Sequence, residues 1–237
     1  MTAGDVVILN RDDPYIAAWE LPEGPTLRWF SVAGAEADAT YEGRTLVLRG
    51  RPLMGRDELP LLGIHNVGNA LAAALAAEAM SVDDATIKRG LMAYEPLAHR
   101  LETVAMVGGV RWVNDSKATN PNAAAAGIRA IEGPLILLAG GSSKDADFTE
   151  IGRLMRDRAR HVVLFGQTRD QLAAAIGVDH PMTVVDTLTQ AVALAADMAT
   201  SGDTVLLGPA CASYDQFRSY VHRGEVFCEL VAGLGDA

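Results

Sequence analysis

The sequence predicts an α/β protein in which a partial α/β domain precedes a Rossmann-like, mostly parallel sheet with helices on both faces. From residue 98 onward, short apolar runs alternate with helical segments, which is typical of right-handed βαβ crossovers. The pattern before Tyr94-Glu95-Pro96-Leu97 is less regular, and this stretch is the best linker candidate. We therefore expect one domain over residues 1–93, a linker over 94–97 and a second domain over 98–237.

The first domain opens with an apolar run over residues 6–9, which predicts a buried strand. Such a strand needs neighbours on both edges and nothing precedes it, so we expect this domain to be incomplete. Two further strands, separated by a weakly structured polar stretch, are expected at residues 27–31 and 45–48. Helices are expected at residues 70–80 and 84–93. Asp83 and Asp84 are more simply interpreted as partners of the second helix dipole than as a catalytic pair.

The second domain opens with a predicted hairpin, in which residues 101–107 and 110–114 are joined by Gly108-Gly109. The strands expected after it are residues 135–139, 162–165, 182–185 and 204–207. Helical segments are expected between them, near residues 122–130, 148–158, 169–176 and 188–199. In a sheet of this kind the carboxyl ends of the parallel strands point to one side.

Composition and charge exclude several classes of protein. The chain is 49% hydrophobic, so it can bury a core, and its net charge of −10 disfavours nucleic acid as a main partner. No apolar run approaches the roughly 18 residues of a membrane span, and the first residues do not form a signal peptide. Cys211 and Cys228 fall in one predicted helix region, and neither they nor the five histidines have metal-ligand spacing. We expect a cytoplasmic protein with no metal site in these residues.

Three polar loops follow three of the predicted strands, at residues 115–119, 140–144 and 208–213. Because ligands bind at the carboxyl ends of strands in open α/β sheets, we expect these loops to converge on one ligand. Their glycines let backbone approach a ligand closely, and Lys117 and Lys144 offer positive charge to a carboxylate or phosphate. The competing interpretation of the first loop is a capped turn before a helix that Pro121 opens. Both interpretations stay open at this point.

Ser213 precedes Gln216 by three residues, which is the spacing of a capping box and predicts a helix start. The apolar stripe of that helix would carry Phe217, Tyr220, Val221, Phe227 and Leu230. Its free N–H groups would suit an anion, although capping alone would justify the serine. Neither a Gly-x-x-x-x-Gly-Lys-Ser/Thr motif nor a Gly-x-Gly-x-x-Gly motif occurs in the chain.

Four segments resemble the Mur ligases of bacterial cell-wall synthesis, and within that family the members that add D-glutamate. They are His65-Asn-Val-Gly-Asn69-Ala-Leu-Ala-Ala, His99-Arg100-Leu-Glu, Trp112-Val-Asn-Asp115-Ser-Lys-Ala-Thr-Asn120 and Gly208-Pro-Ala-Cys-Ala-Ser213-Tyr-Asp-Gln-Phe217. The last two are highly specific within the family. The resemblance covers essentially the whole chain, but only the second half of such an enzyme.

The resemblance implies a site for ATP and a site for D-glutamate. The residues implied to contact ATP are Asn69, Arg100, Asp115 and Lys117, of which Arg100 and Lys117 are the implied catalytic residues. The residues implied to hold D-glutamate are Thr119, Lys144, Ser213, Tyr214 and Tyr220. This set is chemically suitable, because the two carboxylates of D-glutamate match a lysine and hydroxyls. Tyr220 stands where an aromatic residue without a hydroxyl is commoner in the family, and the pair before Lys144 varies.

The implied reaction uses ATP and Mg²⁺ to phosphorylate the carboxylate of UDP-N-acetylmuramoyl-L-alanine, and the amine of D-glutamate then attacks the acyl phosphate. Residues 1–93 would be the C-terminal part of the central ATP-binding domain, and residues 98–237 the C-terminal domain. The P-loop, the Mg²⁺ ligands and the UDP-binding domain would precede Met1, so we expect the chain to be inactive alone. The alternatives are a non-catalytic nucleotide- or glutamate-binding module and a ligase for another amino acid.

Overall fold

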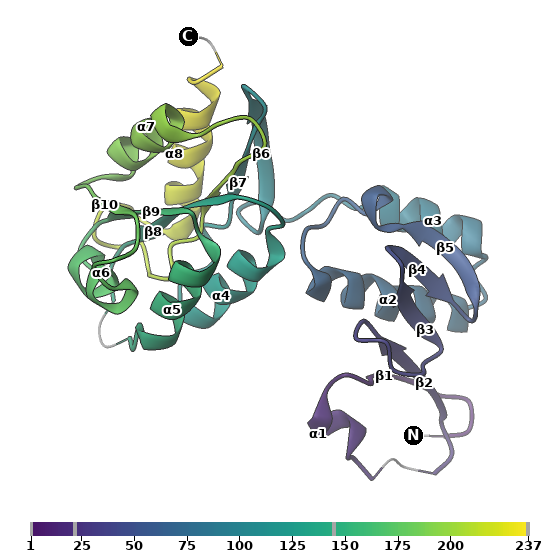
Figure 1. Cartoon of the computed structure of the whole chain (residues 1–237). Helices are drawn as coiled ribbons and strands as arrows, with labels where there is room; N and C mark the ends of the chain where they lie inside the picture. Colours follow the sequence, from purple (N-terminus) through teal and green to yellow (C-terminus); the bar gives the residue numbers. More distant parts are fainter. Residues whose placement is uncertain (1, 21–22, 144–145, 236–237) are drawn as a thin grey trace. The chain divides into compact units, whose positions relative to one another are not determined.

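The computed structural model describes residues 2–20, 23–143 and 146–235, and the chain divides into two compact units, Met1–Glu95 and Pro96–Ala237 (Figure 1). Each unit has its own sheet and its own hydrophobic core. The assignment of these units to an ATPase-type domain and a C-terminal domain stays a prediction. Among the helices described, none is both long and apolar enough to cross a membrane.

The first unit is built on a five-stranded sheet in the order β1-β2-β3-β4-β5. Its strands are β1 (Val6–Asn10), β2 (Thr26–Ser31), β3 (Ala39–Glu42), β4 (Thr45–Leu48) and β5 (Arg51–Gly55). The pairs β1–β2 and β2–β3 are parallel, whereas β3–β4 and β4–β5 are antiparallel. Its helices are α1 (Pro14–Ala17), the 3₁₀ turn η1 (Arg56–Glu58), α2 (Ile64–Ala79) and α3 (Asp84–Met92). The core includes Leu46, Leu48, Val67, Leu71 and Leu75.

Several predictions for this unit need correction. The predicted strand is confirmed as β1, but of its residues only Leu9 is buried, so its predicted burial is wrong. In the described sheet β1 is an edge strand that pairs with β2, and the sequence led us to expect that it would lack a second neighbour. The polar stretch after β2, which we expected to be weakly structured, contains β3. This strand turns into β4 through Gly43 and Arg44, both with positive φ. α2 begins earlier than predicted and includes Asn69. The interpretation of Asp83 is confirmed, because its side chain accepts a hydrogen bond from an N–H in the first turn of α3.

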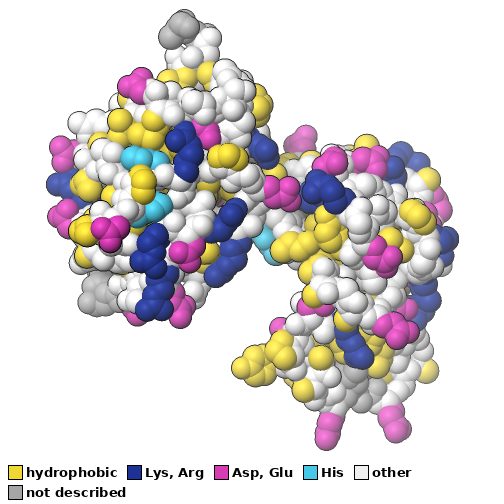
Figure 2. Space-filling view, viewed as in Figure 1, with side chains coloured by type: hydrophobic (Ala, Val, Ile, Leu, Met, Phe, Trp, Pro, Cys, Tyr) yellow, Lys and Arg dark blue, Asp and Glu magenta, His cyan; other side chains and the backbone are white. Residues whose placement is uncertain are grey.

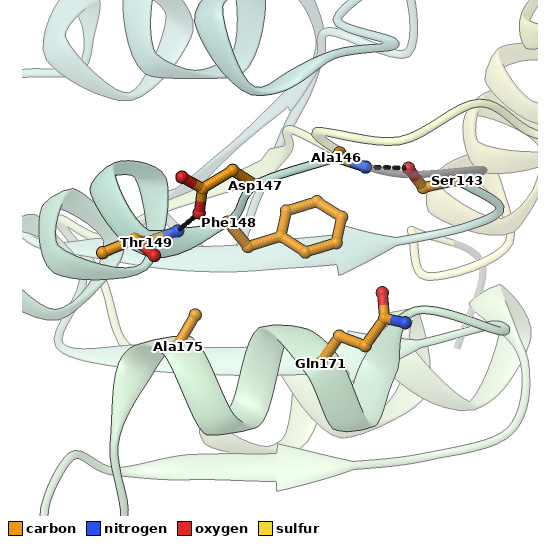
Figure 3. Close-up of a pocket in the computed structure, with 7 residues that line it drawn as sticks. All are labelled: Ser143, Ala146, Asp147, Phe148, Thr149, Gln171 and Ala175. Atoms are coloured by element: carbon orange, nitrogen blue, oxygen red, sulfur yellow. Dashed lines mark hydrogen bonds between the residues drawn. The ribbon is translucent and has the colours of Figure 1, made fainter.

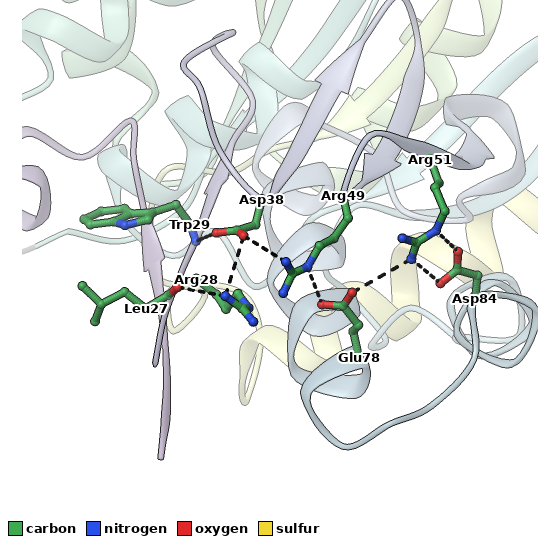
Figure 4. A network of polar contacts seen from close by, with 8 residues as sticks. All are labelled: Leu27, Arg28, Trp29, Asp38, Arg49, Arg51, Glu78 and Asp84. Atoms are coloured by element: carbon green, nitrogen blue, oxygen red, sulfur yellow. Dashed lines mark hydrogen bonds and ion pairs between the residues drawn. The ribbon is translucent and has the colours of Figure 1, made fainter. Parts of the chain in front are cut away.

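A network of ion pairs joins the strands of the first unit to its helices (Figure 4). Its members are Arg28, Asp38, Arg49, Glu78, Arg51 and Asp84. The best geometry is that of Arg51, which donates to both oxygens of Asp84 at 2.9 and 3.1 Å. Most of these groups are solvent-accessible, and exposed ion pairs contribute little to stability. The network thus connects β2, β5 and the turn between β4 and β5 to α2 and α3.

The second unit has a six-stranded sheet in the order β10-β9-β8-β11-β7-β6. Its strands are β6 (Glu102–Val107), β7 (Val110–Asn114), β8 (Leu135–Gly140), β9 (His161–Phe165), β10 (Met182–Val184) and β11 (Thr204–Leu207). β6 is antiparallel to β7, and the other described pairs are parallel. Its helices are α4 (Pro121–Ala130), α5 (Thr149–Arg158), α6 (Arg169–Ile176), α7 (Leu188–Met198) and α8 (Tyr220–Ala232). α7 and α8 cover one face of the sheet and α4, α5 and α6 the other, which confirms the predicted fold class (Figure 1).

The central strands of this sheet are buried on both faces. All residues of β8 and β11 are buried, and so are four of the five residues of β9. Strands covered by helices on both faces appear in the sequence as continuous apolar runs, and these runs are why the strands could be predicted. On the face under α7 and α8, the ring of Trp112 packs against that of Phe227 with centroids 6.2 Å apart.

Three neighbouring strands deliver the three polar loops to one edge of the sheet. β8, β11 and β7 lie side by side and parallel, so their carboxyl ends emerge together, as predicted. The second and third loops touch each other through the isolated bridge between Ser142 and Ala212. The glycines of the second loop serve this packing: a Cβ on Gly140 would overlap the Phe165 carbonyl, and one on Gly141 the Ala212 carbonyl. Packing alone therefore explains these two glycines, and close approach of a ligand to them stays a prediction.

Replacing Gly141 with alanine should destabilise the second unit more than the same replacement at a glycine where only the backbone conformation is affected. Gly202→Ala is the matched control, because Gly202 also has a positive φ but has open space where its Cβ would lie. We expect Gly202→Ala to cost about 1–2 kcal/mol, and Gly141→Ala about 2 kcal/mol more because of the overlap with Ala212. Urea unfolding followed by Trp112 fluorescence, in a Trp19→Phe, Trp29→Phe background, measures both. Equal costs would show that the overlap is relieved without strain.

Candidate functional site

The loop between β7 and α4 joins a strand end to a helix start. Directly after β7, the Asp115 N–H donates to the Leu207 carbonyl of β11 at 2.9 Å. Asn120 caps α4 by accepting a hydrogen bond from the backbone N–H three residues on. The capped-turn interpretation is thus correct for Asn120. It does not account for Asp115, Lys117 and Thr119, whose side chains have no capping role.

The Asp115 carboxyl is buried at the edge of the sheet, with 7% of the residue exposed. One oxygen accepts a hydrogen bond from the Leu101 N–H at 3.2 Å, and the other lies where a Cβ on Gly127 of α4 would collide with it. Burial raises the pKa of Asp115 to about 7, although the Leu101 hydrogen bond and the charge of Arg100 act in the opposite direction. This carboxyl is therefore balanced between its neutral and charged forms near neutral pH, as is common for carboxyls in functional sites.

Arg100 is held beside Asp115 by a strained segment. The residues on either side of it, His99 and Leu101, have φ values of 64° and 47°, a left-handed backbone that residues other than glycine rarely adopt. The His99 carbonyl accepts a hydrogen bond from the Lys117 N–H at 3.0 Å, and the Leu101 N–H donates to Asp115. The loop after β7 thus determines the backbone on both sides of Arg100 and leaves this residue exposed.

Asn114, the last residue of β7, ties this segment to α8. Its fully buried amide nitrogen lies 3.0 Å from Nδ1 of His99 and 3.2 Å from the Gly224 carbonyl, and its oxygen accepts a hydrogen bond from the Ser116 N–H. The His99 ring occupies the space where a Cβ on Gly224 would lie. Sequence analysis gave Asn114 no role beyond ending a strand, because only the fold brings these groups around it.

Lys117 and Tyr220 are in direct contact. Nζ of Lys117 lies 4.0 Å from the centroid of the Tyr220 ring, which is the geometry of a cation–π interaction. The Tyr220 carbonyl also accepts a hydrogen bond from the Ser116 hydroxyl at 2.8 Å. Thr119 is half-buried, and its hydroxyl has no hydrogen-bond partner among the described residues. The structure therefore joins residues that the resemblance divides between the nucleotide and the D-glutamate.

The predicted helix start at Ser213 is wrong. α8 begins at Tyr220, and the side chain of Ser219 caps it. Ser213 lies in the preceding loop, where its carbonyl closes a turn by accepting hydrogen bonds from the N–H groups of Gln216 and Phe217. The local capping pattern was misleading because the chain first crosses the end of the sheet before it enters the helix.

This correction leaves the side chain of Ser213 without a capping function. Ser213 is 1% exposed, and its hydroxyl makes no hydrogen bond to a described residue. The neighbouring Tyr214 is 76% exposed. Cys211 is buried in the same loop, whereas Cys228 lies in α8, so the placement of both cysteines in one helix was also wrong.

Arg223 of α8 holds the first and third loops together, and sequence analysis missed it. Its fully buried guanidinium donates to the hydroxyl and the carbonyl of Ser116, both at 2.9 Å, and to the carbonyls of Cys211 and Ala212 at 3.1 and 3.3 Å. Burial lowers the pKa of Arg223 to about 10, so the group remains charged at neutral pH. Because Ala212 also bridges to Ser142, the second loop is connected to the same cluster.

Two residues implied by the resemblance do not belong to the cluster as described. Lys144 lies outside the described residues. Asn69 belongs to the first unit, where it is exposed on α2 and donates to Asn66 at 3.1 Å. The residues that the second unit brings to one edge of its sheet are Arg100, Asp115, Lys117, Thr119, Ser213, Tyr214 and Tyr220. The described part of the chain contains no group of three or more His, Cys, Asp or Glu side chains suited to a metal ion.

A pocket of about 380 Å³ lies between the start of α5 and α6 (Figure 3). Its lining residues are Ser143, Ala146, Asp147, Phe148, Thr149, Gln171 and Ala175. Two of its polar side chains already have backbone partners, because Ser143 accepts from the Ala146 N–H at 3.2 Å and Asp147 from the Thr149 N–H at 2.9 Å. The hydrogen bonds of Thr149 hold the pKa of Asp147 below its usual range. The pocket begins at the second loop, and no feature of the sequence indicated it.

Comparison with known proteins agrees with the geometry. Residues 99–211 match the family described as "Mur ligase, glutamate ligase domain". The chain is also 40% identical over 233 residues, 98% of its length, to the UDP-N-acetylmuramoylalanine–D-glutamate ligase of Solibacter usitatus. The chain belongs to the Mur ligase family. The ligase of the same name from Nitrosococcus oceani is 41% identical over 95% of this chain, which spans about half the length of these relatives, 53% and 51%.

Solved Mur ligase structures share the fold of this Mur ligase chain. UDP-N-acetylmuramate-alanine ligase MurC from Thermotoga maritima matches with a TM-score of 0.67 at 14% identity, over 96% of this chain and 52% of that one. MurF from the same organism, in complex with ADP, matches with a TM-score of 0.65 at 16% identity, over 98% of this chain and 54% of that one. At these identities the likeness shows the fold alone, and it confirms the predicted fold class.

Removing the Arg223 guanidinium should destabilise the second unit. Arg223→Met leaves the buried carbonyls of Ser116 and Cys211 without a donor, whereas the Ala212 carbonyl keeps its hydrogen bond from the Ser142 N–H. We therefore expect a loss of about 3 kcal/mol. Arg223→Lys keeps the charge but not the planar fork, and an intermediate loss is expected. Arg129→Met, at an exposed position in α4, is the control and should change stability by less than about 0.5 kcal/mol. Urea unfolding measures all three, and a wild-type midpoint for Arg223→Met would contradict the role of Arg223.

The pKa of Asp115 predicts a pH dependence of stability. Its folded-state pKa of about 7 is above that of an unfolded aspartate, so its ionisation penalises folding increasingly as the pH rises from about 4 to about 7. Asp115→Asn removes this penalty while keeping an oxygen for the Leu101 N–H. The variant should therefore gain on the order of 2–3 kcal/mol over wild type between pH 5 and pH 8. Unfolding free energies at both pH values check this, and a difference independent of pH would refute the raised pKa.

Proposed function

We propose that this Mur ligase chain takes part in the ATP-dependent addition of D-glutamate to UDP-N-acetylmuramoyl-L-alanine. The observation that carries the proposal is the convergence of the loops after β7 and β11 around Arg223, which brings Asp115, Lys117, Thr119 and Ser213 to one edge of the sheet. The names of the relatives at about 40% identity support the same reaction. The alternative of a non-catalytic binding module has no specific observation in its favour.

On the nucleotide side, we assign the ribose hydroxyls to Asp115 and the phosphates to Arg100 and Lys117. Asp115 fits because its pKa near neutrality lets the carboxyl hydrogen-bond to hydroxyls in either form. Arg100 fits because its backbone is held by the loop while the residue itself is exposed. Asn69 of the first unit is proposed as a further nucleotide contact.

On the amino-acid side, we assign the carboxylates of D-glutamate to the hydroxyls of Thr119 and Ser213 and to the Lys144 ammonium. Both hydroxyls lack partners within the described part of the chain, so they are available to an anionic acceptor. The Tyr214 N–H also donates to no described acceptor and suits the same carboxylate. Tyr220 supplies an aromatic ring beside them.

The residues of this chain would act mainly by positioning and by charge. Bound ATP supplies the phosphoryl group that activates the substrate carboxylate, and Mg²⁺ neutralises its charge. The D-glutamate amine, held by its two carboxylates, then displaces phosphate and forms the amide bond. Arg100 and Lys117 would stabilise the negative charge on the phosphoryl oxygens during both steps. We assign no Mg²⁺ ligand within this chain.

A cytoplasmic location is part of the proposal. Cys211 and Cys228 are both unpaired, and burial raises the pKa of the Cys211 thiol to about 11, which keeps it unreactive. Basic and acidic side chains are interspersed over the visible face of each unit, so that face offers no broad basic surface for nucleic acid (Figure 2).

Calorimetric titration with D-glutamate tests the proposed amino-acid site. Ser213→Ala and Thr119→Val should each weaken D-glutamate binding about tenfold or more, because each removes a hydrogen bond to a charged group. Lys144→Ala should have at least the same effect, and L-glutamate should bind more weakly than D-glutamate. Ser201→Ala, at an exposed position of the second unit, is the control and should leave binding unchanged. Absence of D-glutamate binding, or equal affinity in all variants, would refute this assignment.

A further inference from the structure

We infer that Tyr220 is a positioning residue for Lys117, and that its ring face holds the Lys117 ammonium in place for a phosphate group of the nucleotide. The inference rests on the proposed function, because it takes the loop after β7 to face ATP. Resemblance alone gives Tyr220 a different task, that of packing beside D-glutamate. The two roles differ in which ligand loses affinity when the ring is removed.

The Tyr220 ring is held firmly enough to orient a partner. Its carbonyl accepts a hydrogen bond from the Ser116 hydroxyl at 2.8 Å, and that same hydroxyl accepts one from the buried Arg223 at 2.9 Å. The ring meets His99 edge to face, with centroids 6.3 Å apart and an interplanar angle of 80°. Lys117 lies over the ring with Nζ 4.0 Å from its centroid. Tyr220 is therefore attached to the loop of Lys117 through its backbone and through its side chain.

An aromatic ring is a better partner than a carboxylate for a lysine that has to bind phosphate. Lys88 of the first unit is paired with a carboxylate, with its Nζ 2.7 Å from Oε1 of Glu58, and an anionic ligand would have to displace that partner. Lys117 forms no ion pair with a described carboxylate and rests on an aromatic face instead. An aromatic face attracts the ammonium through its quadrupole without adding a negative charge. Lys117 thus keeps both its orientation and its charge for an anion.

Nuclear magnetic resonance can observe the contact without any ligand. The chain contains three lysines, Lys88, Lys117 and Lys144, so reductive ¹³C-methylation of the full chain gives few signals, and Lys117→Arg identifies that of Lys117. We expect the Tyr220 ring to shift the Lys117 methyl signal upfield of the Lys88 signal. Tyr220→Leu should abolish this shift and Tyr220→Phe should retain it. An unchanged Lys117 signal in Tyr220→Leu overturns the inference.

Calorimetry with ATP and with adenosine separates positioning from a general structural effect. Tyr220→Leu should weaken ATP binding about three- to tenfold, the range of a cation–π contact, and leave adenosine binding unchanged because adenosine has no phosphate. Tyr220→Phe should restore the ATP affinity. In a Lys117→Met background, Tyr220→Leu should cause no further loss of ATP affinity, since the two residues act through one contact. Tyr15→Leu, which removes a ring that is 82% exposed, is the control.

Two binding results overturn the inference. One is an equal loss of ATP and adenosine affinity in Tyr220→Leu, and the other is an additive loss when Tyr220→Leu and Lys117→Met are combined. Failure of the proposed function gives a different result, because an unsubstituted chain that binds no ATP would refute the nucleotide site itself. The Lys117 signal then still decides whether Tyr220 holds this lysine.

Discussion

The hydrogen bonds of one buried guanidinium define how the loops of this Mur ligase chain meet. Arg223 reaches from α8 to Ser116, which is 107 residues away in the sequence, and also to two carbonyls of its own preceding loop. These described partners are carbonyl and hydroxyl oxygens, so several partial charges offset the cost of burying one full charge. The planar fork gives each bond a direction. The relative positions of the two loops therefore follow from the geometry of one side chain.

Two helix glycines make room for side chains of the site because they have no Cβ. Gly127 of α4 leaves room for the Asp115 carboxyl, and Gly224 of α8 leaves room for the His99 ring. Each glycine lies within a helix, where the residue is unfavourable for backbone entropy, so its presence there is explained by the close approach of a loop side chain. Arg100 directly follows His99, and the next residue, Leu101, donates its N–H to Asp115. The strained backbone on either side of Arg100 persists because its neighbours hold it. Asn114 contacts the His99 ring, the Lys117 N–H donates to the His99 carbonyl, and Asp115 accepts from the Leu101 N–H.

The sequence was sufficient to predict the second unit because local and tertiary signals agree there. Strands buried on both faces appear as apolar runs, and the hairpin turn at Gly108-Gly109 requires the positive φ that both residues have. Prediction failed where a local signal was outweighed. The spacing of Ser213 and Gln216 suggested a cap, but the loop crosses the sheet end first. β3 was missed because its short polar stretch has no apolar pattern.

The candidate site was predictable only in part, for a related reason. Loop composition and the parallel topology indicated that residues 115–119 and 208–213 meet, and the structure confirms that neighbourhood. Arg223 and Asn114 were not predictable, because their importance depends on burial and on partners far apart in sequence. An arginine in a helix is ordinarily a solvated residue, and nothing around Arg223 in the sequence distinguishes it from one.

The charges at this edge of the sheet have a common logic. Elsewhere in the described chain, Arg49, Arg51 and Arg160 are paired with carboxylates. At the loops, Lys117 lies on the Tyr220 ring and Arg223 donates to carbonyl and hydroxyl oxygens, so neither forms an ion pair with a described carboxylate. Burial raises the pKa of the nearby Asp115 to about 7, so this carboxyl carries less than a full negative charge near neutral pH. Lys117 thus keeps a positive charge, unpaired among the described residues, where the parallel strands of this acidic chain end, and a ligand carrying phosphates or two carboxylates would be attracted to it.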